Sequence, residues 1–440
     1  MKRLAAALTI ISALVCPAPA AEPARAGGLL EDIARIGVID HHSHAEAVSA
    51  ARTEKWDLFR PQGTPPYAPV VRLRLNNPEW LRVWHALYGY PHADMNVDHT
   101  RGLLETKLRI MREQGGDFPA WVLDRAGIDV AFVNADTLGP GLEGPRFRWV
   151  PFADALLYPF DKKRATLDRL MRESKASALP ATLGEYVGSV VVPTLERWKS
   201  ARTPAIKFLA AYRRPIDFSP VPEGQAAAAY ARYARGEEPG GDDYKALQDY
   251  LFRRIARECG RVGLVVQVHT GNGNGPYFNN SGANPALLEP ALDDRALRQT
   301  TFVLVHGGWP FEKLAGAMLD KPTVYADFSA QAFYLSTHAL SEVLRGWLEW
   351  QPEKVLFGTD AYSDANTPLS DWEEKAWLTT MIAREALARA LEGMMRDGQI
   401  TRDRALEIAR LVLRENAIRI YGLSVAAGSS PGSRELPSHN

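Results

Sequence analysis

Three histidines stand within four residues near the start of the chain, in the run Gly37-Val38-Ile39-Asp40-His41-His42-Ser43-His44. The apolar residues before them predict a β-strand, in which successive side chains alternate between the two faces. Asp40, His42 and His44 then point one way, and His41 points the other way as a bystander. Neutral imidazole is a common ligand of zinc-like ions, so this strand end suits chelation of a metal. A His-x-His pair also occurs in polar loops, so the rest of the chain must supply the context.

Seven further short apolar runs follow along the chain, and most are separated by segments long enough for a helix. Strands that are apolar on both faces and alternate with helices are typical of a parallel sheet. Counting the first strand, eight β/α units predict an α/β fold of the (β/α)8 TIM-barrel type. No Gly-x-Gly-x-x-Gly follows the first strand, which disfavours an open dinucleotide-binding sheet. The seven runs are 128–133, 147–157, 204–209, 263–269, 301–306, 323–328 and 354–357.

Five of the predicted strands end in residues that can bind a metal or move a proton. Beside the first strand, these residues are Lys207, His269, His306 and Asp360. Because all strand C-termini of a barrel open onto one face, we expect their side chains to converge. Each residue alone has an ordinary structural role, such as a hydrogen bond or a helix cap. Five together favour a metal site.

The order of these residues resembles the amidohydrolase superfamily of metal-dependent barrel enzymes. The finer match is to its amidohydrolase-related branch (amidohydrolase 2), which includes metal-dependent hydrolases, decarboxylases, and the barrel domain fused to glutamine synthetase in some fungi and plants. The resemblance spans about residues 33–423. Its segments are Val268-His269-Thr270-Gly271, Leu304-Val305-His306-Gly307-Gly308-Trp309-Pro310-Phe311, Leu356-Phe357-Gly358-Thr359-Asp360-Ala361, and Glu415-Asn416-Ala417 with Ile420-Tyr421-Gly422-Leu423.

The resemblance implies one or two divalent ions, with zinc as the expected metal. His42, His44 and Asp360 are then ligands of one ion, and His269 joins them or binds a second. His306 belongs to the same metal site. Lys207 matches the position that is carbamylated and bridges the ions in two-metal members. Two readings of Lys207 stay open, because the same lysine can instead hold a substrate carboxylate.

A divalent ion would lower the pKa of a bound water toward neutrality, which makes hydrolysis the leading hypothesis. Asp360 is the expected general acid and base, and His306 the group that polarises the scissile carbonyl. We expect a small-molecule substrate with an amide, ester or lactone bond. Its expected contacts are Tyr212, Arg213, Gln267 and Trp309, and the guanidinium fork of Arg213 suggests that the substrate carries a carboxylate.

Two other functions stay open at this stage. A non-oxidative decarboxylase would use the same ligands, with the metal orienting the substrate carboxylate. A non-catalytic exported barrel could instead bind a small ligand or a surface partner through its aromatic insertion. The intact set of ligand positions argues against this last alternative.

Composition bounds the partners and the domains. The chain has 440 residues, of which 46% are hydrophobic, and its 52 basic and 52 acidic residues give zero formal net charge. Nucleic acid and membrane are therefore unlikely partners on electrostatic grounds, and a homo-oligomer stays open. Residues 1–20 have the parts of a signal peptide, which predicts an exported, periplasmic or secreted protein. We expect a barrel over 21–425, with an aromatic-rich insertion at about 45–100 and extra C-terminal helices, and a disordered tail over 426–440.

Overall fold

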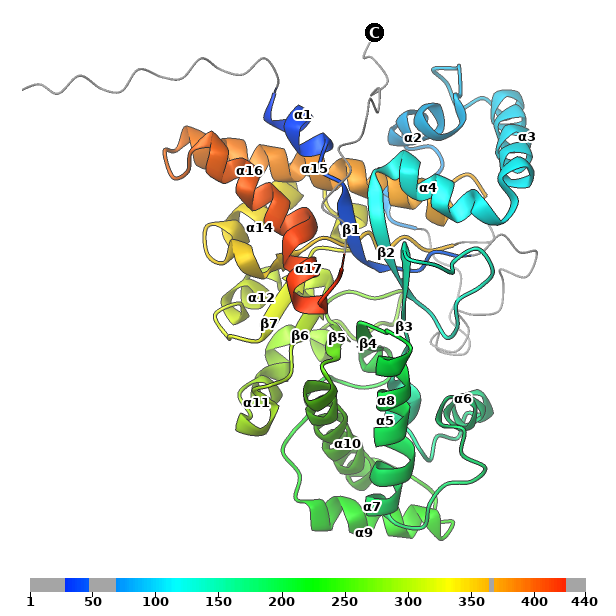
Figure 1. The fold of residues 1–440 in the computed structure, drawn as a ribbon, viewed down its shortest axis with the longest axis vertical. Coiled ribbons are helices and arrows are strands. Elements are labelled where there is room, and N and C mark those ends of the chain that lie inside the picture. Colours follow the sequence, from blue (N-terminus) through cyan, green and yellow to red (C-terminus); the bar gives the residue numbers. More distant parts are fainter. Residues whose placement is uncertain (1–27, 47–68, 364–367, 425–440) are drawn as a thin grey trace, which may run out of the picture.

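The computed structural model describes residues 28–46, 69–363 and 368–424, and eight β-strands lie within them (Figure 1). All their pairings are parallel, and they form two sheets with the orders β1-β2-β3 and β4-β5-β6-β7-β8. Within each sheet every strand pairs with its neighbours in sequence, as in a TIM barrel. The strands are β1 Val38–Ser43, β2 Ile128–Asn134, β3 Phe147–Val150, β4 Ala205–Phe208, β5 Val265–His269, β6 Phe302–Val305, β7 Val324–Asp327 and β8 Val355–Leu356.

The two sheets meet at two seams, and at each seam the ladder is reduced to an isolated bridge. Phe152, after β3, bridges to Lys207 on β4, and His44, after β1, bridges to Tyr362 beyond β8. The predicted α/β fold of the TIM-barrel type is confirmed. The expected continuous closure is not found, because regular pairing stops at the seams and the hydrogen-bonded barrel is not closed.

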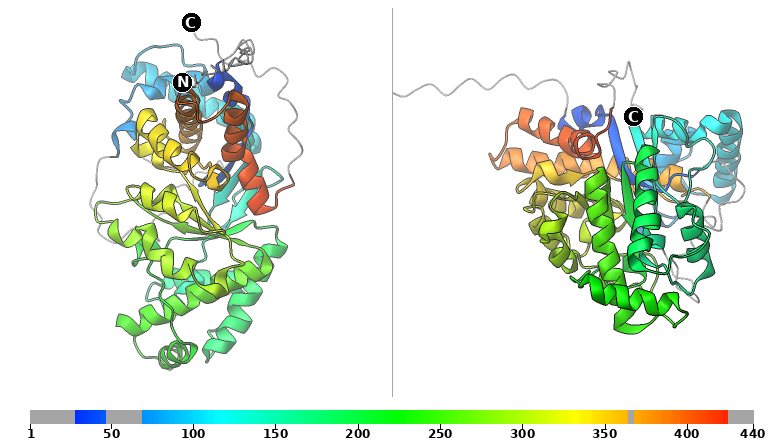
Figure 2. Two further views of the ribbon diagram at one scale, coloured as in Figure 1. Left: turned by 90° about the vertical axis from the view of Figure 1, so that its left-hand side faces the viewer. Right: turned by 60° about the horizontal axis from the view of Figure 1, so that its bottom comes forward.

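Helices lie around the strands in both views of Figure 2. Two described helices end at a left-handed glycine just before a strand, Gly127 before β2 and Gly263 before β5. Glycine adopts this conformation without a Cβ penalty, so it sets a short helix-to-strand connection. The helices are α1 Leu29–Ala34, α2 Glu79–Tyr88, α3 Val97–Gln114, α4 Phe118–Ala126, α5 Asp154–Leu157, α6 Arg164–Ser174, α7 Leu183–Tyr186, α8 Val192–Ser200, α9 Glu223–Ala234, α10 Gly241–Val262, α11 Glu289–Leu292, α12 Glu312–Met318, α13 Gln331–Tyr334, α14 Thr337–Leu348, α15 Trp372–Arg396, α16 Arg402–Arg410 and α17 Asn416–Tyr421.

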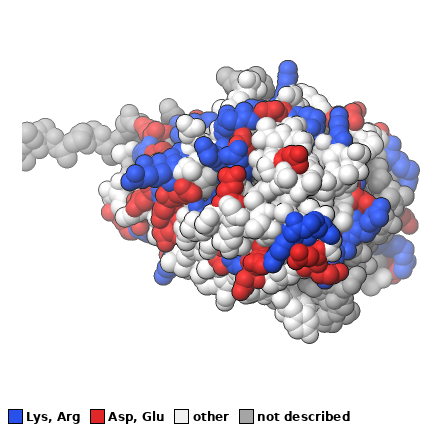
Figure 3. All heavy atoms as spheres, turned by 90° about the horizontal axis from the view of Figure 1, so that it is seen from below, with Lys and Arg blue, Asp and Glu red and all other residues white. Residues whose placement is uncertain are grey.

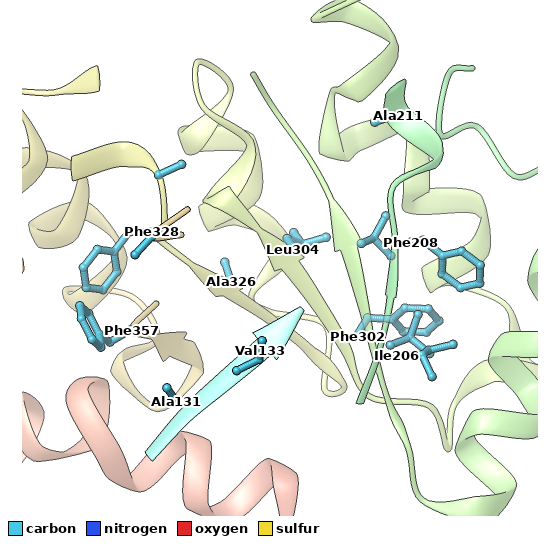
Figure 4. Close-up of a cluster of buried hydrophobic side chains, with 14 of the residues drawn as sticks. Ala131, Val133, Ile206, Phe208, Ala211, Phe302, Leu304, Ala326, Phe328 and Phe357 are labelled. Atoms are coloured by element: carbon cyan, nitrogen blue, oxygen red, sulfur yellow. The ribbon is translucent and has the colours of Figure 1, made fainter. Parts of the chain in front are cut away.

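The strands bury apolar side chains on both faces, which is why their sequences read as continuous apolar runs. One face packs against the helices, and Figure 4 shows part of this layer, including Phe208, Phe302 and Phe328. The other face forms a separate cluster into which α17 inserts Tyr421, whose ring centroid lies 4.7 Å from that of Phe132. The cluster contains Ile39, Val130, Phe132, Val150, Ala205, Val265, Val303, Val305, Leu356, Ala417 and Tyr421.

The predicted strand over residues 147–157 is wrong in its second half. β3 ends at Val150, and Asp154–Leu157 is the short helix α5. Pro151 has no N–H to continue a ladder. The carboxylate of Asp154 then accepts the backbone N–H of Leu209, at 2.9 and 3.0 Å for its two oxygens, which fixes the turn against β4.

The expected insertion falls partly within the described residues. Residues 69–100 hold α2 and the start of α3, and Trp80 and Trp84 of α2 are buried. The indole N–H of Trp84 donates to the Leu369 carbonyl at 2.9 Å, just before α15. Residues 47–68, the predicted signal peptide and the predicted tail lie outside the described residues, so the domain boundaries stay predictions.

The surface seen from below carries basic and acidic side chains interspersed with uncharged ones (Figure 3). This face therefore offers no extended field of one sign. Among the described residues, no helix is both long and apolar enough to cross a membrane.

Candidate metal centre

His42 on β1, His44 after it and Asp360 after β8 bring three ligand atoms together, all within 4.8 Å of one another. One carboxylate oxygen of Asp360 lies 3.1 Å from Nε2 of His42 and 3.3 Å from Nε2 of His44. Within the described part of the chain, this is the one group of three or more such residues that meets this distance. Two imidazoles and a carboxylate are a ligand set that suits zinc and similar divalent ions.

The hydrogen bonds of His44 fix its tautomer. Its Nδ1 lies 2.8 Å from the carbonyl oxygen of Asn134. A carbonyl only accepts, so Nδ1 carries the proton, and in the neutral ring Nε2 presents its lone pair to Asp360. In that tautomer two acceptors face each other at 3.3 Å, an arrangement that a metal ion bound between or beside them would stabilise. The site therefore fits a bound metal ion by its own chemistry.

Backbone geometry at the strand ends aims these side chains. Asp360 and His306 have φ of 54° and 68°, in the left-handed region that non-glycine residues seldom adopt. The N–H of Asp360 donates to the His42 carbonyl at 2.8 Å, which holds the turn against β1. A Cβ at Gly358 would lie 3.0 Å from that of His42, so glycine permits this close approach.

The three residues line a pocket of about 40 Å³ that opens at the strand C-termini. His269, His306 and Lys207 line the same pocket, so all the predicted metal-site residues converge. The ring centroids of His42 and His306 lie 5.2 Å apart, and those of His269 and His306 lie 4.6 Å apart. Their individual roles as ligands stay predictions.

Burial sets the protonation of these groups. It lowers the pKa of His42 and His269 well below the usual value, and that of His306 to about 4, with Lys207 adding to each shift. Burial would raise the pKa of Asp360, but His306 and the adjacent rings of His42 and His44 hold it well below its usual value. These three imidazoles are thus neutral and Asp360 is anionic near pH 7, which are the forms that bind a cation.

Lys207 is fully buried on β4, and its Nζ has no hydrogen-bond partner among the described residues. Nε2 of His269 is buried and unpartnered as well. Burial lowers the pKa of Lys207 to about 7, against the opposing effect of Asp327, Asp360 and Asp154. A neutral amine is the form that reacts with CO₂, so the setting is compatible with the expected carbamate.

A hydrogen-bonded layer lies beneath the pocket and includes His41, which the sequence had suggested was a bystander. His41 does not line the pocket, in line with that expectation, and its Nε2 lies 2.8 Å from a carboxylate oxygen of Asp327 at the end of β7. Asp327 also accepts the hydroxyl of Ser329 at 2.6 Å. The Ser329 hydroxyl proton is donated to Asp327, so the Ser329 oxygen can only accept from His306. Nδ1 of His306 therefore donates to the Ser329 hydroxyl at 3.0 Å, and Nε2 of His306 is the acceptor.

Asp40 is not among the residues that line the pocket with His42 and His44. The pairing of β1 with β2 is irregular between Asp40 and Ser43. The Asp40 carboxylate instead accepts the N–H and hydroxyl of Thr359 at 2.9 and 2.6 Å. Burial raises the pKa of Asp40 to about 7 despite these bonds. Asp40 therefore ties β1 to the strand end that carries Asp360.

The four predicted substrate contacts lie in different places. Tyr212 lines the pocket, while the Trp309 ring stacks on the pocket residue Tyr334 with centroids 4.9 Å apart. Gln267 is fully buried outside the lining, and its amide bonds to the His41 carbonyl, Tyr421 and Asn134. Gln267 was expected to contact the substrate, but its three partners hold this buried amide outside the pocket lining. Arg213 lines a neighbouring cavity.

Several lining residues were missed because they lie on loops after the strands, where no apolar run marks them. The available signal was Asn272-Gly273-Asn274 directly after His269, a polar loop at a predicted strand end. Asp327 was a second missed signal, since it is an acidic residue at the end of a predicted strand. The missed lining residues are Leu209, Asn272, Gly273, Asn274, Ala330, Tyr334 and Tyr362.

A curated relative covers part of the chain. Protein fluG from Emericella nidulans is 26% identical over 231 residues, which are 50% of this chain and 25% of that protein. The chain thus matches about a quarter of the length of this relative.

Solved structures agree with the fold. A proposed metal-dependent hydrolase from Lactobacillus casei ATCC 334 aligns with a TM-score of 0.60 and 16% identity, over 90% of this chain and 97% of that one. Uronate isomerase from Thermotoga maritima aligns with a TM-score of 0.55 and 13% identity, over 89% and 96%. The sequence model of the family described as amidohydrolase matches residues 39–423, which include all three residues of the metal group. The chain belongs to the amidohydrolase family.

Proposed function

We propose that this protein is a metal-dependent hydrolase that cleaves an amide, ester or lactone bond in a small, carboxylate-bearing substrate. The observation that carries the proposal is the contact of the Asp360 carboxylate with the lone-pair side of His44, beside His42. This largely buried arrangement suits a bound cation, and its three residues line a pocket at the strand ends.

We assign His42, His44 and Asp360 as ligands of a divalent ion, most simply zinc, because two imidazoles and a carboxylate match its ligand preference. His269 completes this set or contributes to a second ion, for which Lys207 would have to be carbamylated. When bound, such an ion polarises a carbonyl and supplies a water of lowered pKa.

The residues around the pocket have distinct tasks in this proposal. Asp360 accepts a proton from the attacking water and returns it to the leaving group, since its carboxylate is anionic and faces the pocket. Nδ1 of His306 carries the proton, so its Nε2 is an acceptor that can bind the ion or take a hydrogen bond from water, and polarisation of the scissile carbonyl falls to the ion. Ser329 holds the His306 ring by its Nδ1, which keeps the ring in one orientation.

The test begins with elemental analysis of purified protein and mass detection of a carbamate on Lys207. Metal-depleted and reloaded protein is then assayed on a panel of acyl amino acids, aryl esters and lactones. Release of acid or amine that depends on reloading supports the proposal. Release of CO₂ from carboxylated aromatics, without hydrolysis of the panel, would replace it with the decarboxylase alternative. Protein with less than one ion per chain, unchanged in melting temperature after chelation, would favour the non-catalytic alternative.

Export is a separate part of the proposal and rests on the sequence of residues 1–20, with their basic start, apolar core and Ala-x-Ala-like end. N-terminal mass spectrometry of protein from the native host should find the chain beginning after Ala20. Recovery of the intact N-terminus from the cytoplasm would reject it.

A further inference from the structure

The metal pocket is small, and a second cavity lies beside it. The metal pocket measures about 40 Å³, room for roughly three water-sized groups, whereas the second cavity measures about 170 Å³. We call the second one the outer cavity. Tyr212 and Asn274 line both spaces. A substrate whose reactive bond lies in the metal pocket must therefore place most of its remaining atoms elsewhere, and the outer cavity is adjacent.

Tyr212 forms the wall between the two spaces. Its ring centroid lies 4.7 Å from that of His269 on the metal side and 5.0 Å from that of Phe278 on the outer side. Its hydroxyl accepts the backbone N–H of Asn274 at 3.3 Å, which ties the ring to the loop after β5. An extended molecule can thus pass over one fixed aromatic face from one space to the other.

The charged side chains in the lining of the outer cavity are two arginines, each ion-paired with a carboxylate outside the lining. The lining residues include Arg213 and Arg214 but no Asp or Glu. Arg214 is committed to its surroundings, since its Nε donates to the Pro215 carbonyl and its Nη2 lies 2.6 Å from Asp249. Arg213 makes fewer hydrogen bonds, and one edge of its guanidinium can still donate to a ligand.

The bond that orients Arg213 uses only Nη1, which lies 2.7 Å from an Asp161 oxygen. The guanidinium also lies over the Tyr158 ring, 3.9 Å from its centroid. Among the described residues, Nε and Nη2 make no hydrogen bond. That edge is the one that binds a carboxylate with two parallel hydrogen bonds. The arginine is therefore fixed in place by Asp161 and Tyr158 while an unused fork remains.

We infer that the outer cavity is a subsite for a carboxylate at the far end of the substrate, held by the Nε/Nη2 edge of Arg213. The substrate class is then a two-ended molecule, with the scissile carbonyl at the metal pocket and an anionic group several bonds away, past Tyr212. Tyr277, whose side chain is largely exposed beside this cavity, covers apolar atoms between the two ends. This inference rests on the proposed function, because it uses the metal pocket as the reacting end.

The test compares two esters on metal-loaded protein, mono-4-nitrophenyl glutarate and the uncharged 4-nitrophenyl pentanoate. We expect the anionic ester to have a kcat/KM roughly 10- to 100-fold higher, mainly through a lower KM, as a charge-assisted bidentate pair should give. The double variant Arg213→Gln/Asp161→Asn removes the cation without leaving the buried Asp161 carboxylate unpaired. It should bring the ratio of the two esters close to 1.

The matched control is Lys162→Gln, which removes one positive charge from an exposed side chain outside the cavity. It should leave the ratio of the two esters as in the wild type. A double variant that melts at the wild-type temperature yet keeps the preference would overturn the inference. Equal kcat/KM for the two esters in the wild-type protein would overturn it as well.

Binding separates this inference from the proposed function. Isothermal titration with glutarate and with pentanoate should show tighter binding of glutarate by the wild type, and the double variant should lose that difference. If neither ester is cleaved but glutarate binding still depends on Arg213, the hydrolase proposal fails and the subsite stands. If both esters are cleaved and glutarate binds the wild type and the double variant equally, the subsite fails and the hydrolase proposal stands.

Discussion

Two of the buried lysines, Lys107 and Lys207, have surroundings that differ in a way that separates structure from function. Nζ of Lys107 on α3 lies 2.7 Å from carboxylate oxygens of both Glu373 and Glu374 on α15, and it donates to the Pro368 carbonyl. Nζ of Lys207 on β4 has no hydrogen-bond partner among the described residues. Both side chains are almost fully buried.

The pKa values of the two lysines move in opposite directions. Burial would lower the pKa of Lys107, but Glu373 and Glu374 outweigh it and raise that pKa above its usual value. At Lys207 burial prevails, and the pKa falls to about 7. A buried charge with a complete set of partners joins two helices, whereas a buried amine without partners is costly unless something else completes its site. We call the strand-end group of Lys207, His42, His44, His269, His306 and Asp360 the incomplete cluster, because Nζ of Lys207 lacks a partner there.

The largest expected effect tests whether the incomplete cluster is catalytic. Asp360→Asn keeps the shape of the side chain but removes the anion that binds the cation and moves the proton. We expect kcat to fall by on the order of 10²- to 10⁴-fold on any substrate found in the panel, with the fold retained in circular dichroism. Asp98→Asn, at an exposed position on α3, is the control and should leave kcat unchanged. Near wild-type activity of Asp360→Asn would show that the site is assigned incorrectly.

The convergence of the metal group could be predicted from the sequence for a physical reason. Apolar runs locate parallel strands, and parallel strands end on one face, so polar residues directly after the runs must meet there. His42, His44 and Asp360 needed no knowledge of side-chain contacts to be placed together. The fold class followed from the same alternation of strands and helices.

The hydrogen bonds and ion pairs of buried side chains could not be predicted in this way, because they depend on partners far away in the chain. Gln267 lies on a predicted strand next to His269, yet Tyr421, 154 residues later, accepts from its amide at 3.1 Å. Lys107 meets Glu374 across 267 residues. The seams were hidden for a similar reason, since an apolar run predicts a strand but does not say where its ladder stops.

A matched pair of substitutions tests the comparison directly. Lys107→Met leaves Glu373 and Glu374 buried without their cation, and we expect a loss of about 3–5 kcal/mol in the free energy of unfolding. Lys207→Met replaces an unpaired amine by an apolar side chain of similar size, so metal-depleted protein should lose little stability or gain some. Urea unfolding of both variants, measured without metal, provides the two values. Equal losses would show that Lys207 is a structural residue like Lys107.

Metal removal should affect one cluster and not the other. An ion that binds only the folded state stabilises it by about 2.7 kcal/mol when present at 100 times its Kd. The melting temperature of the wild type should therefore fall after chelation and recover on reloading. His42→Ala, which removes one ligand, should show a much smaller fall in melting temperature on chelation. Lys107→Met should have a lower melting temperature than the wild type but show the same fall on chelation. A chelation shift of full size in His42→Ala would place the ion elsewhere.

The smallest effect concerns the backbone around the incomplete cluster. Ala330 lines the metal pocket with φ of 61° and ψ of −30°, a conformation that a Cβ makes costly. Such strain is typically about 1–3 kcal/mol for one residue, and functional sites are where proteins retain it. Ala330→Gly should relieve the strain, although it also loses a buried methyl group and gains unfolded-state freedom.

The control substitution Ala332→Gly in α13 separates the effect of backbone strain from the loss of the methyl group and the gain in unfolded-state freedom. Ala332 is buried like Ala330 but has no positive φ, so Ala332→Gly loses the same methyl group and gains the same freedom without relief of strain. The free energy of unfolding of Ala330→Gly should therefore exceed that of Ala332→Gly by about 1–3 kcal/mol. If the two variants unfold at the same urea concentration, the backbone at Ala330 carries no strain. The pocket would then differ from the Lys107 cluster only in its unsatisfied side chains.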